Sequence, residues 1–456
     1  MIRQCTFSMR FMHAVCMLFL LMCCCEIYIW RSWFWRILRV NTANLTISNA
    51  TRYELNIKSS SVEETDVKIQ SECLNGIVFR QEKVQEHAWL PVDQGMNAYV
   101  FSAFYDAETN SVLLIGLKLS GVILRYTCQL WYANGTGRGH VNSHVFRESK
   151  MVVDNAYGES HERRYTSVRF KCFSPLGKKP SYVSAVETPC REPSNHIAVK
   201  SMEIPKTYKR RFTVCLMPLH NNFNDSYALV QWIELNLLLG AENFVVYNYS
   251  SSANIRTILD LYTKRNITEV VQWSIPVEEV HYFGQVAAIN DCLYRSKHDS
   301  EFLVNVDLDE YIIPRYNAKT WSDVIANSSE IAFVFRNVFY RKDVSSREND
   351  FPNKPMAEEY KLSTLLTSVH DAKILPHNQR SKYIVRTSKV NVLMIHEVPF
   401  FGNGARALFV SPHVASVHHY RDDKADHDKF IHDDTVLQKY GQQLIENVKD
   451  TWEHLS

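Results

Sequence analysis

Hydrophobic and polar positions first set apart the N-terminal seventy residues. Residues 11–30 are one apolar block of twenty, with Glu26 as its only acidic residue. A helix of this length spans about 30 Å, the thickness of a bilayer's hydrocarbon core. No small-residue cleavage site follows it, so the pattern predicts an uncleaved transmembrane signal anchor rather than a cleaved signal peptide. Residues 1–10 would then be a cytoplasmic tail and residues 31–70 a stem, which is polar from residue 41 onward.

The next stretch has the pattern of strands. Residues 98–104, 111–119, 122–131 and 165–172 are β-branched and aromatic runs, broken by Gly, Asn and Asp. No long amphipathic helix separates them. We therefore expect a β-rich, antiparallel N-terminal domain over residues 71–205.

From residue 206 apolar strands alternate with helices. Strands are expected at 212–217, 244–247, 267–273 and 302–306, and helices at 227–239, 255–264 and 285–297. This order predicts right-handed crossovers and an α/β domain over residues 206–430, with a mostly parallel sheet and flanking helices. Residues 431–456 would form a helical tail. Sheets of this kind bind ligands at the carboxyl ends of their strands, so the chemistry should lie there.

Composition and cysteines narrow the class of protein. The 456 residues are 46% hydrophobic and 22% charged, which excludes a mostly disordered chain. The net charge of +2 gives no reason to expect nucleic acid as a partner. Beyond the anchor, an even number of cysteines without a C-x-x-C motif favours disulfides in an oxidising compartment over zinc or buried free thiols, with the pairing left open. The candidates are Cys73, Cys128, Cys172, Cys190, Cys215 and Cys292.

Glycosylation sequons all follow the apolar block, which is compatible with a lumenal body. Asn224 and Asn248 also carry the triplet. Asn248 ends a predicted strand at the ligand edge, and we expect it to stay unmodified because a glycan there would block the site. The predicted glycosylation sites are Asn44, Asn49, Asn134, Asn266 and Asn327.

The strongest chemical pattern follows the strand at 302–306. This strand runs directly into Asp307, Asp309 and Glu310. In extended conformation Asp307 and Asp309 share one face. Mn²⁺ or Mg²⁺ favours such oxygen-rich, partly open coordination, and the metal could neutralise a nucleotide diphosphate as it leaves.

The pentapeptide Asp307-Leu308-Asp309-Glu310-Tyr311 resembles the D-x-D-E-F/Y motif of glycosyltransferase family 92, with Tyr where Phe is frequent. The resemblance covers about residues 210–425. Further segments resemble family motifs in the same order: Trp232-Ile233-Glu234 leading into 240–247, Gly284-Gln285 followed by Asn290-Asp291-Cys292, Ser381-Lys382-Tyr383-Ile384-Val385, and His418-His419-Tyr420-Arg421.

This resemblance implies a single-pass type II Golgi membrane enzyme with a GT-A-like catalytic domain in the lumen. It would transfer galactose from UDP-galactose to a glycan acceptor with inversion, possibly onto fucose of N-glycans. The residues implied are Asp307, Asp309 and His419 as metal ligands, and Tyr247, Gln285, Lys382 and Arg421 at the donor. For the catalytic base, the sequence leaves Glu310 and Glu397 as alternatives.

Two other functions compete with this interpretation. One is a catalytically inactive relative that binds glycans or nucleotides. The other is a phosphatase of the haloacid dehalogenase type, which also places D-x-D after a parallel strand. That class carries the motif on its first strand, whereas here three strand–helix units precede it, so the phosphatase is disfavoured.

Overall fold

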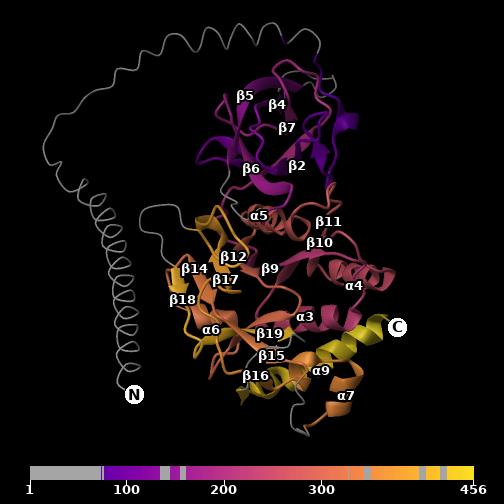
Figure 1. Ribbon diagram of the computed structural model, residues 1–456, viewed down its shortest axis with the longest axis vertical. Helices are drawn as coiled ribbons and strands as arrows, with labels where there is room; N and C mark the ends of the chain where they lie inside the picture. The colour runs from indigo at the N-terminus through magenta and orange to yellow at the C-terminus, as the bar shows by residue number, and fades with distance from the viewer. Residues whose placement is uncertain are drawn as a thin grey trace, which may run out of the picture. The chain divides into compact units, whose positions relative to one another are not determined.

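The computed structural model describes residues 73, 77–133, 144–154, 161–326, 328–343, 351–399, 407–421 and 429–455 (Figure 1). The chain divides into two units, Met1–Val67 and Lys68–Ser456, and the described residues belong to the second. The predicted tail, anchor and stem lie outside the described residues, as do Asn44, Asn49, Asn134 and Asn327. Asn266 is exposed and Asn248 is buried.

The predicted location needs correction. Over the part of the chain that the structure describes, no helix combines the length and apolar character needed to cross a bilayer. The prediction of a single-pass Golgi membrane protein is therefore wrong for these residues.

The β-rich region closes into a barrel. Its eight-stranded sheet has the order β1-β2-β3-β6-β5-β4-β7-β8, and a parallel pairing of β2 with β8 joins its ends. All other neighbours are antiparallel, as the sequence predicts. The strands are β1 (Leu90–Pro91), β2 (Ala98–Asp106), β3 (Ser111–Leu119), β4 (Tyr126–Ala133), β5 (His144–Asp154), β6 (Tyr165–Phe173), β7 (Tyr182–Val186) and β8 (Ile197–Ser201), with a short helix η1 (Gln81–Lys83) before them.

Close packing inside the barrel depends on Gly116. A Cβ atom at this position would lie 2.5 Å from the Phe170 ring and 2.6 Å from the Tyr99 carbonyl oxygen. Strand β3 can therefore lie between β2 and β6 only because residue 116 has no side chain.

The α/β region has a seven-stranded sheet of order β11-β10-β9-β12-β17-β14-β18. Its first four strands are parallel, whereas β17 is antiparallel to both β12 and β14. The α/β class is confirmed, and the sheet is mixed: β14 and β18 run in the same direction as the first four strands, and β17 alone is reversed. The elements are β9 (Arg210–Leu219), α3 (Ser226–Leu239), β10 (Asn243–Asn248), α4 (Ala253–Lys264), β11 (Thr268–Gln272), η2 (His281–Gly284), α5 (Gln285–Ser296), β12 (Ser300–Asn305), β14 (Ala332–Phe335), β17 (Lys382–Arg386), η3 (Thr387–Lys389) and β18 (Ala407–Phe409).

Local sequence explains where the first helix begins and ends. Asp225 caps α3 by accepting a hydrogen bond from the backbone N–H of Ala228, and Gly240 ends the helix in the left-handed conformation at φ 113°. The glycine has no Cβ to oppose that conformation. The turn returns the chain to β10 beside β9, which creates the parallel half of the sheet.

A third sheet covers the end of β12 and has the order β13-β19-β15-β16-β20. In its register Glu310 pairs with His419, so the carboxylate motif and the late histidine become neighbours although 109 residues separate them. Its elements are β13 (Glu310–Pro314), β15 (Asn337–Arg341), β16 (Val369–Asp371), β19 (Ala415–Arg421) and β20 (Phe430–His432), with helices α6 (Trp321–Ile325), α7 (Lys354–Glu359), α8 (Ser363–Leu366) and α9 (Thr435–Leu455) nearby.

A buried polar cluster connects the barrel to the seven-stranded sheet. Asp291 of α5 accepts hydrogen bonds from Ser102 of β2 and from Tyr247 of β10, and it pairs with Arg295 at 2.9 Å. Burial would raise the pKa of Asp291, but Arg295 and these hydrogen bonds outweigh burial and lower it. The cluster therefore keeps a charged pair inside the protein, where each group depends on the other.

Disulfides join the candidate cysteines, and the sequence prediction of disulfides is confirmed. The pairs are Cys73–Cys190, Cys128–Cys172 and Cys215–Cys292. The first two belong to the barrel region, and the third ties β9 to α5.

Candidate active site

A cavity of about 680 Å³ lies at the carboxyl ends of β9 and β12, where the sequence predicts the ligand. Its charged and titratable lining residues are Asp225, Asp307, Asp309, His419, Lys342, Arg380 and Arg421. A second cavity of about 670 Å³ lies around Lys200, Glu269 and Arg295. We assign the active site to the first cavity because only there do the motif carboxylates meet a histidine and several cations.

The carboxylate motif forms a turn, not the extended strand that the sequence suggested. Strand β12 ends at Asn305, and the Glu310 backbone N–H donates to the Asp307 carbonyl at 3.1 Å. The Trp232 indole N–H donates to the same carbonyl at 2.9 Å, and the Tyr420 N–H donates to the Asp309 carbonyl at 2.9 Å. These bonds hold both aspartates at the rim, where their side chains are 35% and 48% exposed.

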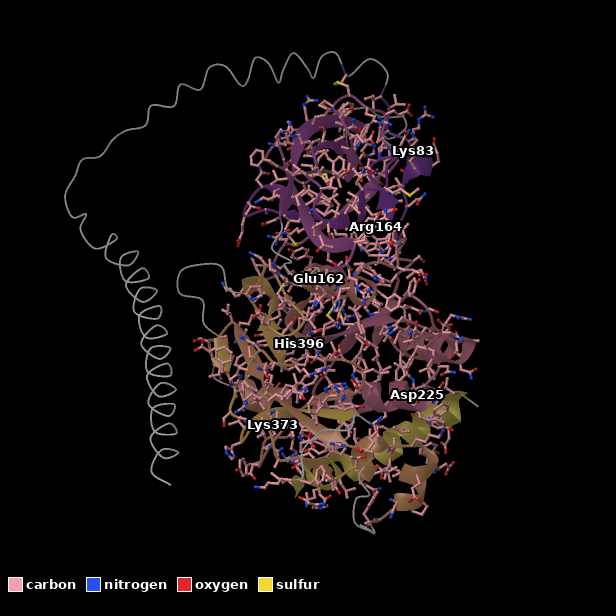
Figure 2. All side chains as sticks on the ribbon, in the orientation of Figure 1. Lys83, Glu162, Arg164, Asp225, Lys373 and His396 are labelled. Atoms are coloured by element: carbon pink, nitrogen blue, oxygen red, sulfur yellow. A yellow bond between two sulfur atoms is a disulfide. The ribbon has the colours of Figure 1, made fainter. Side chains whose placement is uncertain are left out.

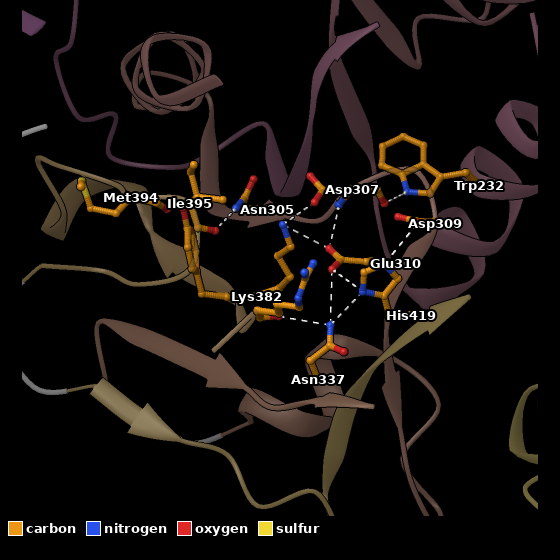
Figure 3. A network of polar contacts seen from close by, with 12 residues as sticks. Trp232, Asn305, Asp307, Asp309, Glu310, Asn337, Lys382, Met394, Ile395 and His419 are labelled. Carbon is orange, nitrogen blue, oxygen red and sulfur yellow. Dashed lines mark hydrogen bonds and ion pairs between the residues drawn. The ribbon is translucent and has the colours of Figure 1, made fainter. Parts of the chain in front are cut away.

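His419 faces this turn from β19 (Figure 3). Its Nε2 lies 3.1 Å from Asp309 Oδ2, and its Nδ1 lies 3.2 Å from Glu310 Oε1 and 3.2 Å from Asn337 Nδ2. The ring is therefore held from behind by β13 and β15, while its outer nitrogen points to the cavity. Burial would raise the pKa of Asp309, but its contact with His419 lowers it.

Lys382 and Glu310 lie beneath the turn, out of reach of solvent. The Lys382 ammonium is 2.7 Å from Asp307 Oδ2 and 3.2 Å from Glu310 Oε2, and both buried side chains are 1% exposed or less. Burial would lower the pKa of Lys382, but Asp307 and Glu310 outweigh it and raise it. Burial also raises the pKa of Glu310, against the attraction of Lys382. Lys382 is therefore a counter-ion of the motif.

This placement corrects two predicted roles. Glu310 cannot reach an acceptor as the base, since its oxygens contact Lys382, His419 and the Asp307 backbone N–H inside the protein. Lys382 cannot reach a diphosphate without leaving its two carboxylates. Both residues instead shape the turn that carries Asp307 and Asp309.

Of the other predicted site residues, one lines the cavity and three do not. Arg421 lines the cavity as expected. Tyr247 is fully buried and donates to Asp291 at 2.6 Å, and Gln285 is 4% exposed at the start of α5, so neither lines the cavity. Glu397 is exposed on the segment after η3 and lies outside the cavity lining. The roles predicted for Tyr247, Gln285 and Glu397 do not fit these positions.

Several cavity residues escaped the sequence analysis. Arg380 immediately precedes the Ser381-Lys382 motif, so its proximity to that motif was the available clue. The guanidinium carbons of Arg380 and Arg421 lie 5.9 and 5.3 Å from the centre of the Phe339 ring, which places two cations around one aromatic side chain. Tyr282, 53% exposed, also lines the cavity, and Asp225, labelled in Figure 2, marks its rim.

The donor atoms suit a hard divalent cation. Asp309 and His419 supply oxygen and nitrogen side by side, with Asp307 on the same turn. Glu310 contacts the other ring nitrogen of His419, as carboxylates commonly do behind metal-bound histidines. Over the described residues, the one group of three such ligands within 4.8 Å of one another is Cys73, Glu148 and Cys190, and its cysteines form a disulfide. Of the three predicted ligands, Asp309 and His419 therefore lie together, whereas Asp307 does not come within 4.8 Å of both.

Comparisons with known proteins agree on one family. Residues 210–454 match the model of glycosyltransferase family 92. Over 400 residues the chain is 22% identical to beta-1,4-galactosyltransferase galt-1 of Caenorhabditis elegans, covering 84% of this chain and 86% of that protein. It is 26% identical over 242 residues to glycosyltransferase family 92 protein F13G3.3 of the same organism, covering 50% and 45%. A structure of GalNAc-T7 with UDP, GalNAc and Mn²⁺ overlaps 56% of this chain and 49% of that one at 13% identity, but its TM-score of 0.29 carries no argument.

Proposed function

The chain belongs to glycosyltransferase family 92, and we propose on this premise that it transfers galactose from UDP-galactose to a glycan with inversion, in a metal-dependent reaction on a GT-A-like domain. The choice of galactose is supported by the relative named a beta-1,4-galactosyltransferase, which is 22% identical to this chain over 400 aligned residues. Fucose of N-glycans is the acceptor that the family resemblance suggests.

The observation that carries the proposal is the Asp309–His419 pair, faced by Lys342, Arg380 and Arg421 in one cavity. A nucleotide diphosphate carries concentrated negative charge, and planar guanidinium groups bind phosphate oxygens through two parallel hydrogen bonds. These cations support the proposal of a diphosphate-bearing donor in this cavity.

The protein's own groups prepare the site for a divalent cation. Mn²⁺ or Mg²⁺ held by Asp309 and His419, with Asp307 beside them, would stabilise the charge that develops on the leaving diphosphate. Glu310 fixes the orientation of His419, and Lys382 fixes that of Asp307. These contacts keep the ligands in place before the donor binds.

The test is UDP release from a panel of UDP-sugars by the purified protein with Mn²⁺, with and without fucosylated N-glycan acceptors. We expect acceptor-dependent release that is greatest with UDP-galactose. Release that depends on the acceptor but prefers another sugar would replace galactose in the proposal. Binding of UDP without release for any donor and acceptor would favour the inactive relative.

A further inference from the structure

Three consecutive residues at the cavity have left-handed backbones. Tyr282, Phe283 and Gly284 have φ values of 43°, 55° and 75° in the short segment η2. Glycine adopts this conformation freely, whereas tyrosine and phenylalanine adopt it at a cost in free energy. Such strain persists only where surrounding contacts impose it, and it is concentrated at functional sites.

Contacts from the α/β region impose this conformation. The Trp273 indole N–H donates to the Phe283 carbonyl at 2.8 Å, and the Phe283 ring stacks on His220 with centroids 4.5 Å apart. A Cβ atom on Gly284 would lie 2.8 Å from Ile275, so this position tolerates only glycine without rearrangement. Phe283 and Gly284 are thus fixed against the sheet.

The barrel holds the same segment from its other side. The Tyr165 backbone N–H of β6 donates to the Glu279 carbonyl at 2.9 Å, and Arg164, labelled in Figure 2, pairs with the Glu279 side chain at 3.4 Å. His281 stacks on His161 with centroids 3.7 Å apart. The position of the turn therefore depends on both the barrel and the sheet.

The contacts from both regions hold the turn so that one of its side chains is exposed to the cavity. Tyr282 is the residue of the turn that is exposed, at 53%, and it lines the cavity edge-on to His220, with ring centroids 5.2 Å apart. Apolar residues also line this cavity, namely Leu216 and Pro218 of β9 and Phe223 after it. The same cavity also holds the carboxylates of the motif and the cations Lys342, Arg380 and Arg421.

A cavity lined by both an exposed aromatic ring and several cations suits a nucleotide sugar, in which a ribose joins a flat aromatic base to a charged diphosphate. An aromatic side chain on a rigid support is a suitable surface for a base, because stacking needs a large flat contact and gains from a partner that is already ordered.

We propose that Tyr282, backed by His220, forms the surface on which the nucleobase of the donor stacks, and that the strained turn exists to hold its ring there. The inference rests on the proposed function, because it takes a nucleoside diphosphate sugar as the ligand. It adds a binding subsite at the junction of barrel and sheet, and it gives the barrel a part in donor binding.

The experiment measures binding of UDP and of inorganic pyrophosphate, each with Mn²⁺, by calorimetry on the full protein. We expect Tyr282→Ala to weaken UDP binding at least about fivefold and to leave pyrophosphate binding within about twofold, since stacking on one base contributes about 1–3 kcal/mol, a factor of about five or more. Tyr282→Phe keeps the ring and should bind UDP within about twofold of the parent protein.

Glycine variants separate strain from structural damage. Tyr282→Gly should raise the melting temperature and weaken UDP binding together, because it relieves the left-handed strain and removes the ring. Tyr316 is the matched control, since it is also a tyrosine with positive φ, at 49°, and is 76% exposed outside the cavity lining. Tyr316→Gly should raise the melting temperature with no change in UDP binding.

The results have distinct meanings. If the parent protein binds neither UDP nor pyrophosphate, the proposed function fails. If the parent binds UDP and Tyr282→Ala binds it equally well, the nucleobase subsite is overturned while the proposed function stands. Equal losses for UDP and pyrophosphate would also overturn it, because they would place Tyr282 at the diphosphate.

Discussion

Replacing Lys382 by methionine tests whether a buried ion pair builds the carboxylate turn. Lys382 is fully buried, 2.7 Å from Asp307 and 3.2 Å from Glu310, and Glu310 is itself 1% exposed. Methionine fills similar space but leaves Glu310 without its cation. Breaking a buried pair by removing one partner costs about 3–5 kcal/mol, and protonation of Glu310 would recover part of it at about 1.4 kcal/mol for each pKa unit.

The assay is urea unfolding at pH 7, monitored by tryptophan fluorescence, for Lys382→Met, for Glu310→Gln and for the double variant. We expect Lys382→Met to lower the free energy of unfolding by about 3 kcal/mol or more. Adding Glu310→Gln should recover part of this loss, because the second change removes the unpaired charge. The coupling energy in this double-mutant cycle should reach about 1–3 kcal/mol.

Lys449 provides the control, because it also pairs with a glutamate but on the surface. Its ammonium lies 3.7 Å from Glu453 on α9, and both side chains are at least half exposed. Lys449→Met should change the free energy of unfolding by about 0.5 kcal/mol or less. If Lys382→Met behaves like Lys449→Met, or if the coupling with Glu310→Gln is absent, the turn does not depend on the buried pair and our reasoning is refuted.

Three further predictions concern the metal pair, the barrel junction and acid stability. Asp309→Asn should lower kcat/KM for transfer by about a hundredfold or more with an unchanged melting temperature, since its side chain is 48% exposed, and EDTA should abolish transfer until Mn²⁺ is added back. Asp291→Asn should lower the melting temperature in thermal unfolding, because it leaves the buried Arg295 without its buried carboxylate. Burial lowers the pKa of His196 to about 4, so the unfolded chain takes up a proton near pH 6.5 before the folded protein does. His196 should therefore contribute about 3 kcal/mol to the fall in the free energy of unfolding as the pH drops from 6.5 to 4, and urea titrations across this range should show a fall smaller by about that amount in His196→Gln.

The first half of the α/β sheet could be predicted from the sequence because its pattern is local. Each strand from β9 to β12 is a short apolar run, and α3 ends at a glycine that the structure places at φ 113°. The reversed strand β17 could not be predicted in this way. Strand β17 pairs with β12 across some 80 residues, and no local periodicity specifies such a partner.

At the site, the sequence predicted which residues take part better than it predicted how exposed they are. A lone lysine is by default a solvated charge, so the burial of Lys382 becomes evident only once Asp307 and Glu310 are seen in the turn above it. Tyr282 gave no clue in the sequence, because left-handed positions are normally recognised by glycine or asparagine. Its conformation is imposed by Trp273 and the barrel, which are distant along the chain.

The consecutive histidines of β19 show how one strand can serve both the core and the site. Side chains alternate along a strand, so His418 and His419 must point to opposite faces. His418 is fully buried, its Nε2 lies 3.2 Å from the Tyr340 hydroxyl, and its ring stacks on Tyr340 at 4.3 Å. Burial lowers the pKa of His418 well below its usual value, so it packs there as a neutral ring.

Tyr340 also donates to Asp433 at 2.8 Å, and Arg315 pairs with the same carboxylate at 2.7 Å. The inner face of β19 is thereby tied to β15, to the end of β13 and to the residues before α9. Because the strand cannot shift without breaking these contacts, His419 on the other face stays 3.1 Å from Asp309. The buried His418 thus positions His419, and substitutions at His418 should alter the donor site by shifting β19.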